Sequence, residues 1–157
     1  MKIKFIASAL LVTCGFGFTA FTAEKPHNPN DHTHEKKVAG PNRGRILTGL
    51  DPRAEFFVTA DRKVQITFLD KNGKPVAPAA QVVTVTAGSR AAPTTLTFIK
   101  SGNVLVSNSA LPAGNQFPTV VQIVPTAGAE TVVHKFNTDL SKCGACKNAE
   151  YACICDH

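Results

Sequence analysis

The chain has 157 residues, a length typical of one domain, with 43% hydrophobic residues and a formal net charge of +6. Its 17 Lys and Arg residues are spread along the sequence, and no basic run is longer than Lys36-Lys37. Nucleic-acid binding usually needs a concentrated basic stripe with stacking aromatic residues, so this composition argues against it.

Residues 1–23 predict a signal peptide, because Lys2 and Lys4 precede an apolar run with small residues near its end. Cleavage close to its end would place the protein in the periplasm or outside the cell. The mature chain would keep 15 of the 17 Lys and Arg residues against 11 acids, a formal charge of +4. Two alternatives stay open, an uncleaved membrane anchor and a lipoprotein attached through Cys14. Membrane contact is expected through this segment alone.

Residues 24–44 predict a flexible segment, because prolines, histidines and charged residues leave almost nothing to build a core. His32 and His34 would share one side of an extended chain. With His27 and the nearby acids they would form a weak site for Cu(II), Ni(II) or Zn(II). The alternative is a solvated segment without a ligand, because histidine enrichment is only a compositional signal.

Residues 45–139 predict a β domain. Apolar and polar residues alternate over 63–69, and Asn72-Gly73 is a strong turn signal. The first strand is expected to begin at 45–47. The further expected strands are 54–60, 63–69, 81–87, 94–100, 103–109, 117–124 and 131–137.

Short strands separated by regular turns predict a small all-β fold, an antiparallel Greek-key or immunoglobulin-like sandwich of about seven strands. The tryptophan and inter-sheet disulfide of antibody domains are missing. The core is expected to lie wholly upstream of residue 141. Its predicted members are Phe57, Val64, Ile66, Phe68, Val83, Val85, Leu96, Phe98, Val104, Val106, Val121, Ile123 and Phe136.

Residues 140–157 form a Cys-rich tail, called here the C-terminal segment. Its ligand-type residues are Cys143, Cys146, Cys153, Cys155 and His157. A C-x2-C turn brings two sulfurs together, and a C-x-C on an extended segment places two more on one face. Four thiolates suit a soft or borderline cation, either Zn(II) or Cu(I), with His157 as an auxiliary ligand.

Disulfides are the alternative for the same residues. Export favours them, and loss of Cys14 with the signal peptide would leave an even four cysteines. Two bridges between the C-x2-C and C-x-C pairs would then make the chain a stapled extracellular interaction module without a metal. The spacing alone leaves both possibilities open.

Catalysis is not expected. His134 lies on a predicted strand without a serine or carboxylate motif around it. An electron-transfer copper site would need a cysteine in the β region and usually a methionine, but Met1 is the only methionine. The C-x2-C pair follows a strand rather than opening a helix, which argues against a thiol oxidoreductase.

Two short patches resemble exported heavy-metal resistance proteins, especially the periplasmic adaptor subunits of cation efflux systems. Gly40-Pro41-Asn42-Arg43-Gly44 is similar to their Gly-Pro-x-Gly-Gly turn, with Arg43 in place of a glycine. Tyr151-Ala152-Cys153 is similar to the start of their Tyr-x-Cys-Pro-Met-His motif, although Ile154 and Cys155 replace the proline and methionine. The resemblance implies a stand-alone metal-binding relative, and it names no protein partner.

Overall fold

The computed structural model describes residues 37–155, which belong to one compact unit. The expected signal peptide and the histidines at positions 27, 32, 34 and 157 lie outside the described residues. Within 37–155, no helix is long and apolar enough to cross a membrane.

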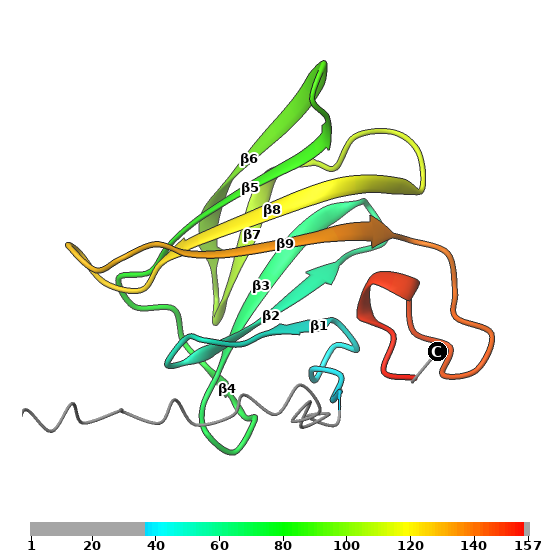
Figure 1. The fold of residues 1–157 in the computed structure, drawn as a ribbon. Helices are drawn as coiled ribbons and strands as arrows, with labels where there is room; N and C mark the ends of the chain where they lie inside the picture. Colours follow the sequence, from blue (N-terminus) through cyan, green and yellow to red (C-terminus); the bar gives the residue numbers. More distant parts are fainter. Residues whose placement is uncertain (1–36, 156–157) are drawn as a thin grey trace, which may run out of the picture. The chain divides into compact units, whose positions relative to one another are not determined.

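The fold is all-β, as predicted, and every described strand pair is antiparallel (Figure 1). Eight of the strands fall on the expected ranges, and the two-residue β4 was not predicted. The strands are β1 (Arg45–Leu47), β2 (Arg53–Val58), β3 (Lys63–Leu69), β4 (Pro75–Val76), β5 (Val82–Ser89), β6 (Ala92–Ser101), β7 (Val104–Ala110), β8 (Gln116–Val124) and β9 (Val132–Asp139).

The strands form one continuous sheet in the order β1-β2-β3-β7-β6-β5-β8-β9, with β4 paired to β3. The expected sandwich of about seven strands is not confirmed, and β6 gives the physical reason. Its first part pairs with β5, from Ala92 to Thr97, and its last four residues pair with β7. One long strand therefore joins two groups of strands that a sandwich would keep as separate sheets.

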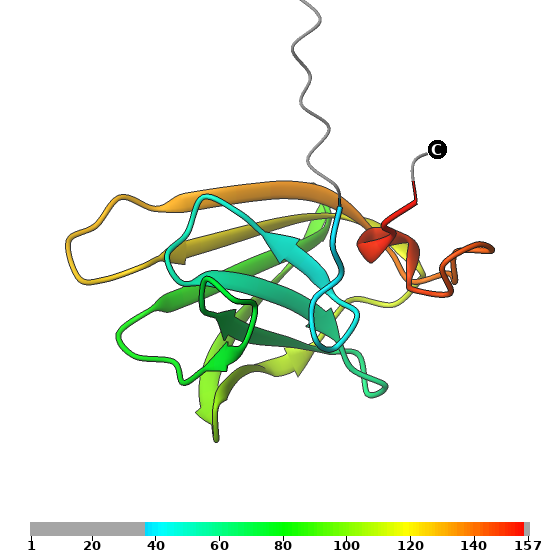
Figure 2. The same ribbon diagram turned by 90° about the horizontal axis from the view of Figure 1, so that it is seen from below.

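The sheet curls so far that its two edge strands, β1 and β9, approach each other (Figures 1 and 2). Phe136 of β9 packs edge-to-face on Phe56 of β2, with 5.2 Å between ring centroids. The guanidinium of Arg45, on β1, lies 4.7 Å from the centroid of the Phe136 ring. Aromatic and cation–π contacts thus fill the gap in the nearly closed sheet.

The core follows the alternation of the strands, but two positions differ by one residue from the prediction. Most predicted members are buried, including Ile66, Val85 and Val121 at 0% exposure. Phe56 is buried instead of Phe57, and Leu105 instead of its neighbours at 104 and 106. Side chains alternate between the two faces of a strand, so an error of one residue exchanges inside for outside.

A buried carboxylate fixes the residues that lead into β1. Glu55 is 0% exposed and accepts hydrogen bonds from the backbone N–H groups of Asn42 (2.9 Å) and Gly44 (2.8 Å). The Asn42 side-chain amide donates to its other oxygen at 2.8 Å. A Cβ on Gly40 would lie 2.3 Å from the Glu55 side chain. Glycine at that position allows the chain to wrap closely around the carboxylate.

The expectation that the core lies wholly upstream of residue 141 is wrong. Tyr151 and Ala152, both 4% exposed, belong to the main hydrophobic cluster together with strand residues. They lie on η1 (Glu150–Ala152), a single 3-10 turn in the C-terminal segment. The sequence pattern could not reveal this contact, because two isolated apolar residues have no period.

Candidate metal centre

The C-terminal segment begins as a small hairpin that leaves the end of β9 (Figure 1). Lys142 and Ala149 form an antiparallel bridge, and the Cys143 N–H donates to the Asn148 carbonyl at 2.8 Å. The Lys147 N–H donates back to the Cys143 carbonyl at 3.2 Å and closes the C-x2-C turn. Backbone bonds therefore shape the turn that carries the first two cysteines.

Tyr151 attaches this segment to the sheet. Its ring packs edge-to-face on Phe56 with 5.7 Å between centroids. Its hydroxyl accepts the Val58 N–H at 2.9 Å, and its carbonyl accepts a bond from Arg45 at 3.3 Å. Burial, as the largest cause, raises the pKa of the Tyr151 hydroxyl to about 12. A neutral, buried tyrosine thus fixes the chain immediately before Cys153.

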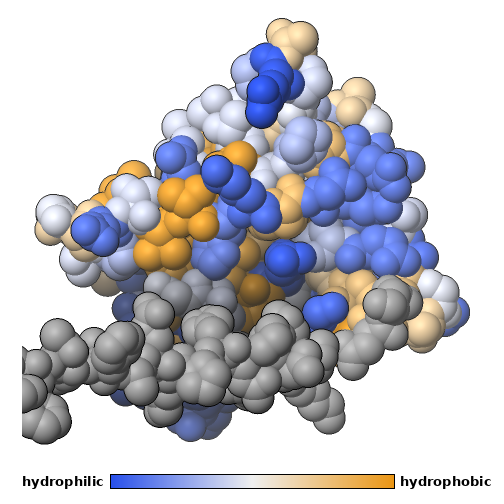
Figure 3. Space-filling view, in the orientation of Figure 1, coloured by the Kyte–Doolittle hydropathy of each residue, from blue (hydrophilic) through white to orange (hydrophobic). Residues whose placement is uncertain are grey.

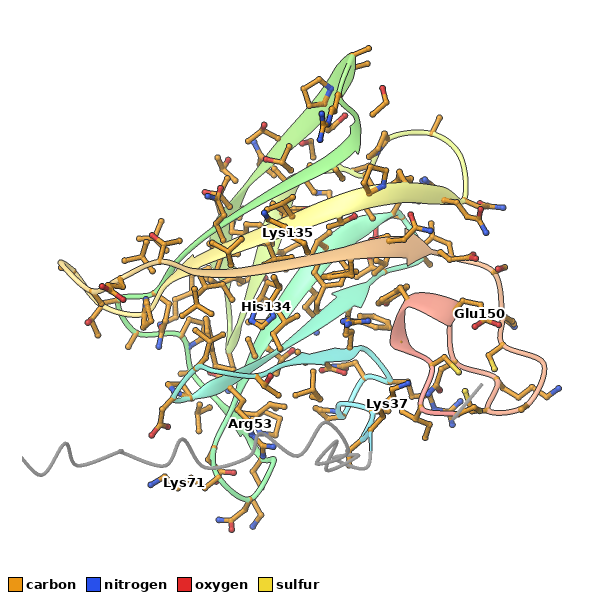
Figure 4. The ribbon with its side chains drawn as sticks, in the orientation of Figure 1. Lys37, Arg53, Lys71, His134, Lys135 and Glu150 are labelled. Atoms are coloured by element: carbon orange, nitrogen blue, oxygen red, sulfur yellow. The ribbon has the colours of Figure 1, made fainter. Side chains whose placement is uncertain are left out.

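After η1 the chain returns beneath the C-x2-C turn, and the four cysteines meet. Their Sγ atoms all lie within 4.8 Å of one another. The separations are 3.3 Å for Cys143–Cys153, 3.7 Å for Cys146–Cys153 and 3.9 Å for Cys143–Cys155. Figure 4 shows the sulfur atoms gathered beside the part of the chain that carries Glu150. No disulfide joins these four cysteines.

These separations fit a tetrahedral site. With a Zn–S distance near 2.3 Å, the edge of a sulfur tetrahedron measures about 3.8 Å. The three separations above lie within about half an ångström of that edge. Cys143 is 1% exposed, whereas the other three cysteines are half-buried. The cluster could hold one metal ion close to the surface.

The sulfurs differ in their affinity for protons. Backbone N–H groups of Ile154 and then Asn148 lower the pKa of Cys146 to about 6. A hydrogen bond to Cys146, followed by burial, raises the pKa of Cys155 to about 12. The Cys153 pKa is also raised: a backbone bond from Cys155 lowers it, but burial and contacts with Cys143 and Cys146 outweigh that bond. Without a cation, a thiolate at Cys146 is stabilised, and the raised pKa values of Cys153 and Cys155 keep those two thiols protonated.

A cleft of about 810 Å³ gives access to the centre from one side. Cys153 and Cys155 line it at one place, and Lys37, Arg45 and Arg53 supply three cationic side chains against one carboxylate, Glu150. Figure 4 shows Lys37, Arg53 and Glu150 along this side of the molecule. Two of the four cysteines therefore lie along a cleft that is open to an incoming molecule.

The structure brings together four of the eight predicted ligands, the cysteines. Histidines 27, 32, 34 and 157 stay predictions, because they lie outside the described residues. Of the five histidines only His134 is described, and it lies on β9, outside the cysteine group. Its Nε2 is buried without a hydrogen-bond partner among the described residues.

Sequence reasoning missed two residues that position the centre. Tyr151 was noted only through a motif resemblance, although a single tyrosine beside a ligand cysteine was a usable signal. Asn148 is 7% exposed, and its backbone shapes the turn through bonds to Cys143 and Cys146. No pattern in the sequence indicates that role.

Comparison with family models, with curated proteins and with solved structures finds no match to this chain.

Proposed function

We propose that this is an exported metal-binding protein whose four C-terminal cysteines hold one thiophilic cation. The observation that carries the proposal is the convergence of all four Sγ atoms within 4.8 Å. Two segments separated by η1 supply the sulfurs in pairs, and backbone N–H groups already favour a thiolate at Cys146. Four converging sulfurs, one of them stabilised as a thiolate, are better suited to binding a cation than to contact with solvent.

Zn(II) is the first candidate. A four-sulfur tetrahedral site is typical of structural zinc, and the sulfur separations match its dimensions. Cu(I) is the second candidate, because thiolates also select this soft ion. Cu(II) would belong to the imidazoles of His27, His32 and His34, as a separate and weaker site. His157 would serve as an auxiliary ligand of the cysteine centre.

Binding rather than catalysis is the role that this ligand set supports. A catalytic zinc keeps an open position for water or substrate, whereas four thiolates close the coordination shell. The approach through the cleft beside Cys153 and Cys155 would serve ligand exchange, that is, loading and release of the ion.

Export remains part of the proposal, supported by Lys2, Lys4 and the apolar run that follows them. In an oxidising compartment a bound cation would also protect the thiolates from disulfide formation. The two-patch resemblance to periplasmic proteins of metal efflux agrees with this location.

Titration of the reduced protein with Co(II) under anaerobic conditions tests the function. We expect one equivalent to give the charge-transfer and visible bands of tetrahedral cobalt thiolate, and Zn(II) to displace it. Replacing Cys153 and Cys155 together by serine should abolish the bands. Replacing His32 and His34 by alanine should leave them intact and remove only a weaker site.

Alkylation of the protein purified from its own compartment separates the proposal from the disulfide alternative. We expect thiols that become reactive after chelation of the metal, without any reductant. Reactivity only after reduction, combined with no metal retained by the reduced protein against a competing chelator, would reject metal binding in favour of the staple.

A further inference from the structure

A second cleft, of about 480 Å³, shares Tyr151 with the first and has an unusual charge. Its charged lining residues are Arg43, Arg62, Lys142 and Lys147, and no described carboxylate lines it. The four come from three separate parts of the chain: the turn before β1, the β2–β3 turn and the C-terminal segment. The fold therefore gathers four positive charges without neutralising them.

The backbone at three of these four residues is in the left-handed region. The φ angles are 65° at Arg43, 62° at Arg62 and 65° at Lys147, and no other described non-glycine residue has a positive φ. Glycine occupies the comparable turn position at Gly73, with φ of 77°. A residue with a Cβ costs about 1–2 kcal/mol there, so these turns keep basic side chains where glycine would be more stable.

Local contacts explain only part of this choice. Arg62 donates to the carbonyls of Pro112 and Gly114, and the Lys147 ammonium donates to Gly144 at 2.7 Å. These partners are neutral, so both charges stay uncompensated. The side chains of Arg43 and Lys142 make no hydrogen bond or ion pair with any described group. Nothing within the described chain accounts for a charged residue in the left-handed conformation at position 43.

Three carboxylates lie near the cleft without lining it: Asp61 and Glu150 are each flanked in the chain by two lining residues, and Glu55 lies close to Asn42. Asn42 covers Glu55, whose oxygens already accept three hydrogen bonds from Asn42 and Gly44. Glu55 is 0% exposed, so a ligand in the cleft cannot replace these contacts. The three carboxylates reduce the positive field, but none of them lines the cleft beside the four cations.

We propose that this cleft binds a small oxyanion with two or more negative charges, of the phosphate or polycarboxylate type. Arg and Lys side chains are the usual partners of such anions, and a hollow of this size admits a small molecule. Arg62 and Lys147, held by carbonyls, form a fixed wall, whereas Arg43 and Lys142 are available to close on the ligand. Lys142 and Lys147 flank the C-x2-C pair, so the bound anion lies beside the metal centre. The anion site does not depend on the proposed metal binding, because none of its four cationic residues belongs to the cysteine cluster.

The test uses Arg43→Gly, because this one change should raise the stability of the fold and lower the affinity for the anion. Glycine relieves the backbone strain, so the thermal midpoint should rise by about 3 °C. The same change removes a charge, so affinity for inorganic phosphate should fall about tenfold. Calorimetry on the reduced, metal-loaded full chain would measure phosphate, sulfate and succinate, with chloride at matched ionic strength as reference. Comparison of the affinities for phosphate and sulfate with that for succinate distinguishes phosphate-type from carboxylate ligands.

Lys142→Gln provides a second variant without a backbone effect, and we expect a similar loss of affinity. Lys135→Gln is the matched control, since Lys135 is exposed on β9 outside the cleft (Figure 4). It should bind phosphate as the parent protein does. The proposal is overturned if the parent binds none of the divalent anions more tightly than chloride. It is equally overturned if the Arg43→Gly/Lys142→Gln double variant keeps the parent affinity.

Discussion

The strand body, residues 45–139, and the C-terminal segment are ordered by different kinds of interaction. In the body, inward side chains of successive strands form a continuous core, and most of its large members are completely buried. In the described part of the C-terminal segment, the buried hydrophobic residues are only Cys143, Tyr151 and Ala152. Polar and charged residues cover the surface where β9 ends (Figure 3).

The two regions offset the loss of conformational entropy on folding in different ways. Burial of apolar surface offsets the entropy cost across the body, as in any small domain. The C-terminal segment buries too little for that. Its order depends on one anchor, Tyr151, and on four sulfurs that a cation would cross-link. Small segments without a core commonly rely on such a metal.

Truncation after Asp139 tests the anchor and should have the largest effect on stability. Losing the Tyr151 ring uncovers Phe56 and leaves the Val58 N–H without its partner. We expect the free energy of unfolding to fall by about 3–5 kcal/mol, as for removal of a large buried side chain. Urea unfolding followed by far-ultraviolet circular dichroism would measure it.

Tyr151→Phe is the matched variant for that experiment. It keeps the ring and removes only the hydroxyl that accepts the Val58 N–H, so we expect a loss of about 1–2 kcal/mol. A truncated protein as stable as the full chain would mean that the contacts of Tyr151 do not stabilise the strand body.

Removal of the metal should affect the C-terminal segment much more than the strand body. Chelation under reducing conditions should increase amide exchange at least tenfold over residues 143–155, because the sulfurs lose the cation that joins them. Exchange in β3, β5 and β8 should stay nearly unchanged. Tyr151 is the only tyrosine and tryptophan is absent, so intrinsic fluorescence reports the segment alone. Equal loss of protection in both regions would show that the metal stabilises the whole fold.

The sequence predicted the body well because the body depends on repetition. The strand over 63–69 and the Asn72-Gly73 turn come from local signals, and both are confirmed, although burial alternates only as far as Ile66. Gly73 has φ of 77° and its N–H donates to the Asp70 carbonyl at 3.0 Å. The arrangement in one sheet was not predictable in this way. It depends on β6 changing partner at Phe98, which leaves no mark in the hydrophobic pattern.

The sequence predicted the four cysteines of the candidate metal centre but not the residues that position them. Cysteine spacing alone indicated that Cys143, Cys146, Cys153 and Cys155 would converge. The docking of Tyr151 on Phe56 joins residues 95 positions apart, and the Glu55 contacts bring together parts of the chain with no common motif. Such tertiary contacts follow from the closure of the sheet, so local sequence reasoning does not reach them.

The smallest expected effect concerns His134 and belongs to the body alone. Burial, as the main cause, lowers the pKa of His134 below its ordinary 6.5; a hydrogen bond to the Thr48 backbone raises it and the charge of Arg45 lowers it further. Between the folded pKa and 6.5, the unfolded chain binds more protons than the folded protein does. The free energy of unfolding should therefore decrease as the pH falls through 6.5 and level off below the folded pKa.

His134→Gln should flatten this part of the pH profile. The cysteine thiols are common to both proteins, so their contribution cancels in the difference between the two curves. Urea unfolding from pH 7.5 to 5, followed by circular dichroism, measures that difference in the body. Identical profiles for the two proteins would show that His134 has the same pKa folded and unfolded. The acid sensitivity of the molecule would then come from the thiolates of the C-terminal segment, which must take up protons as they release a cation.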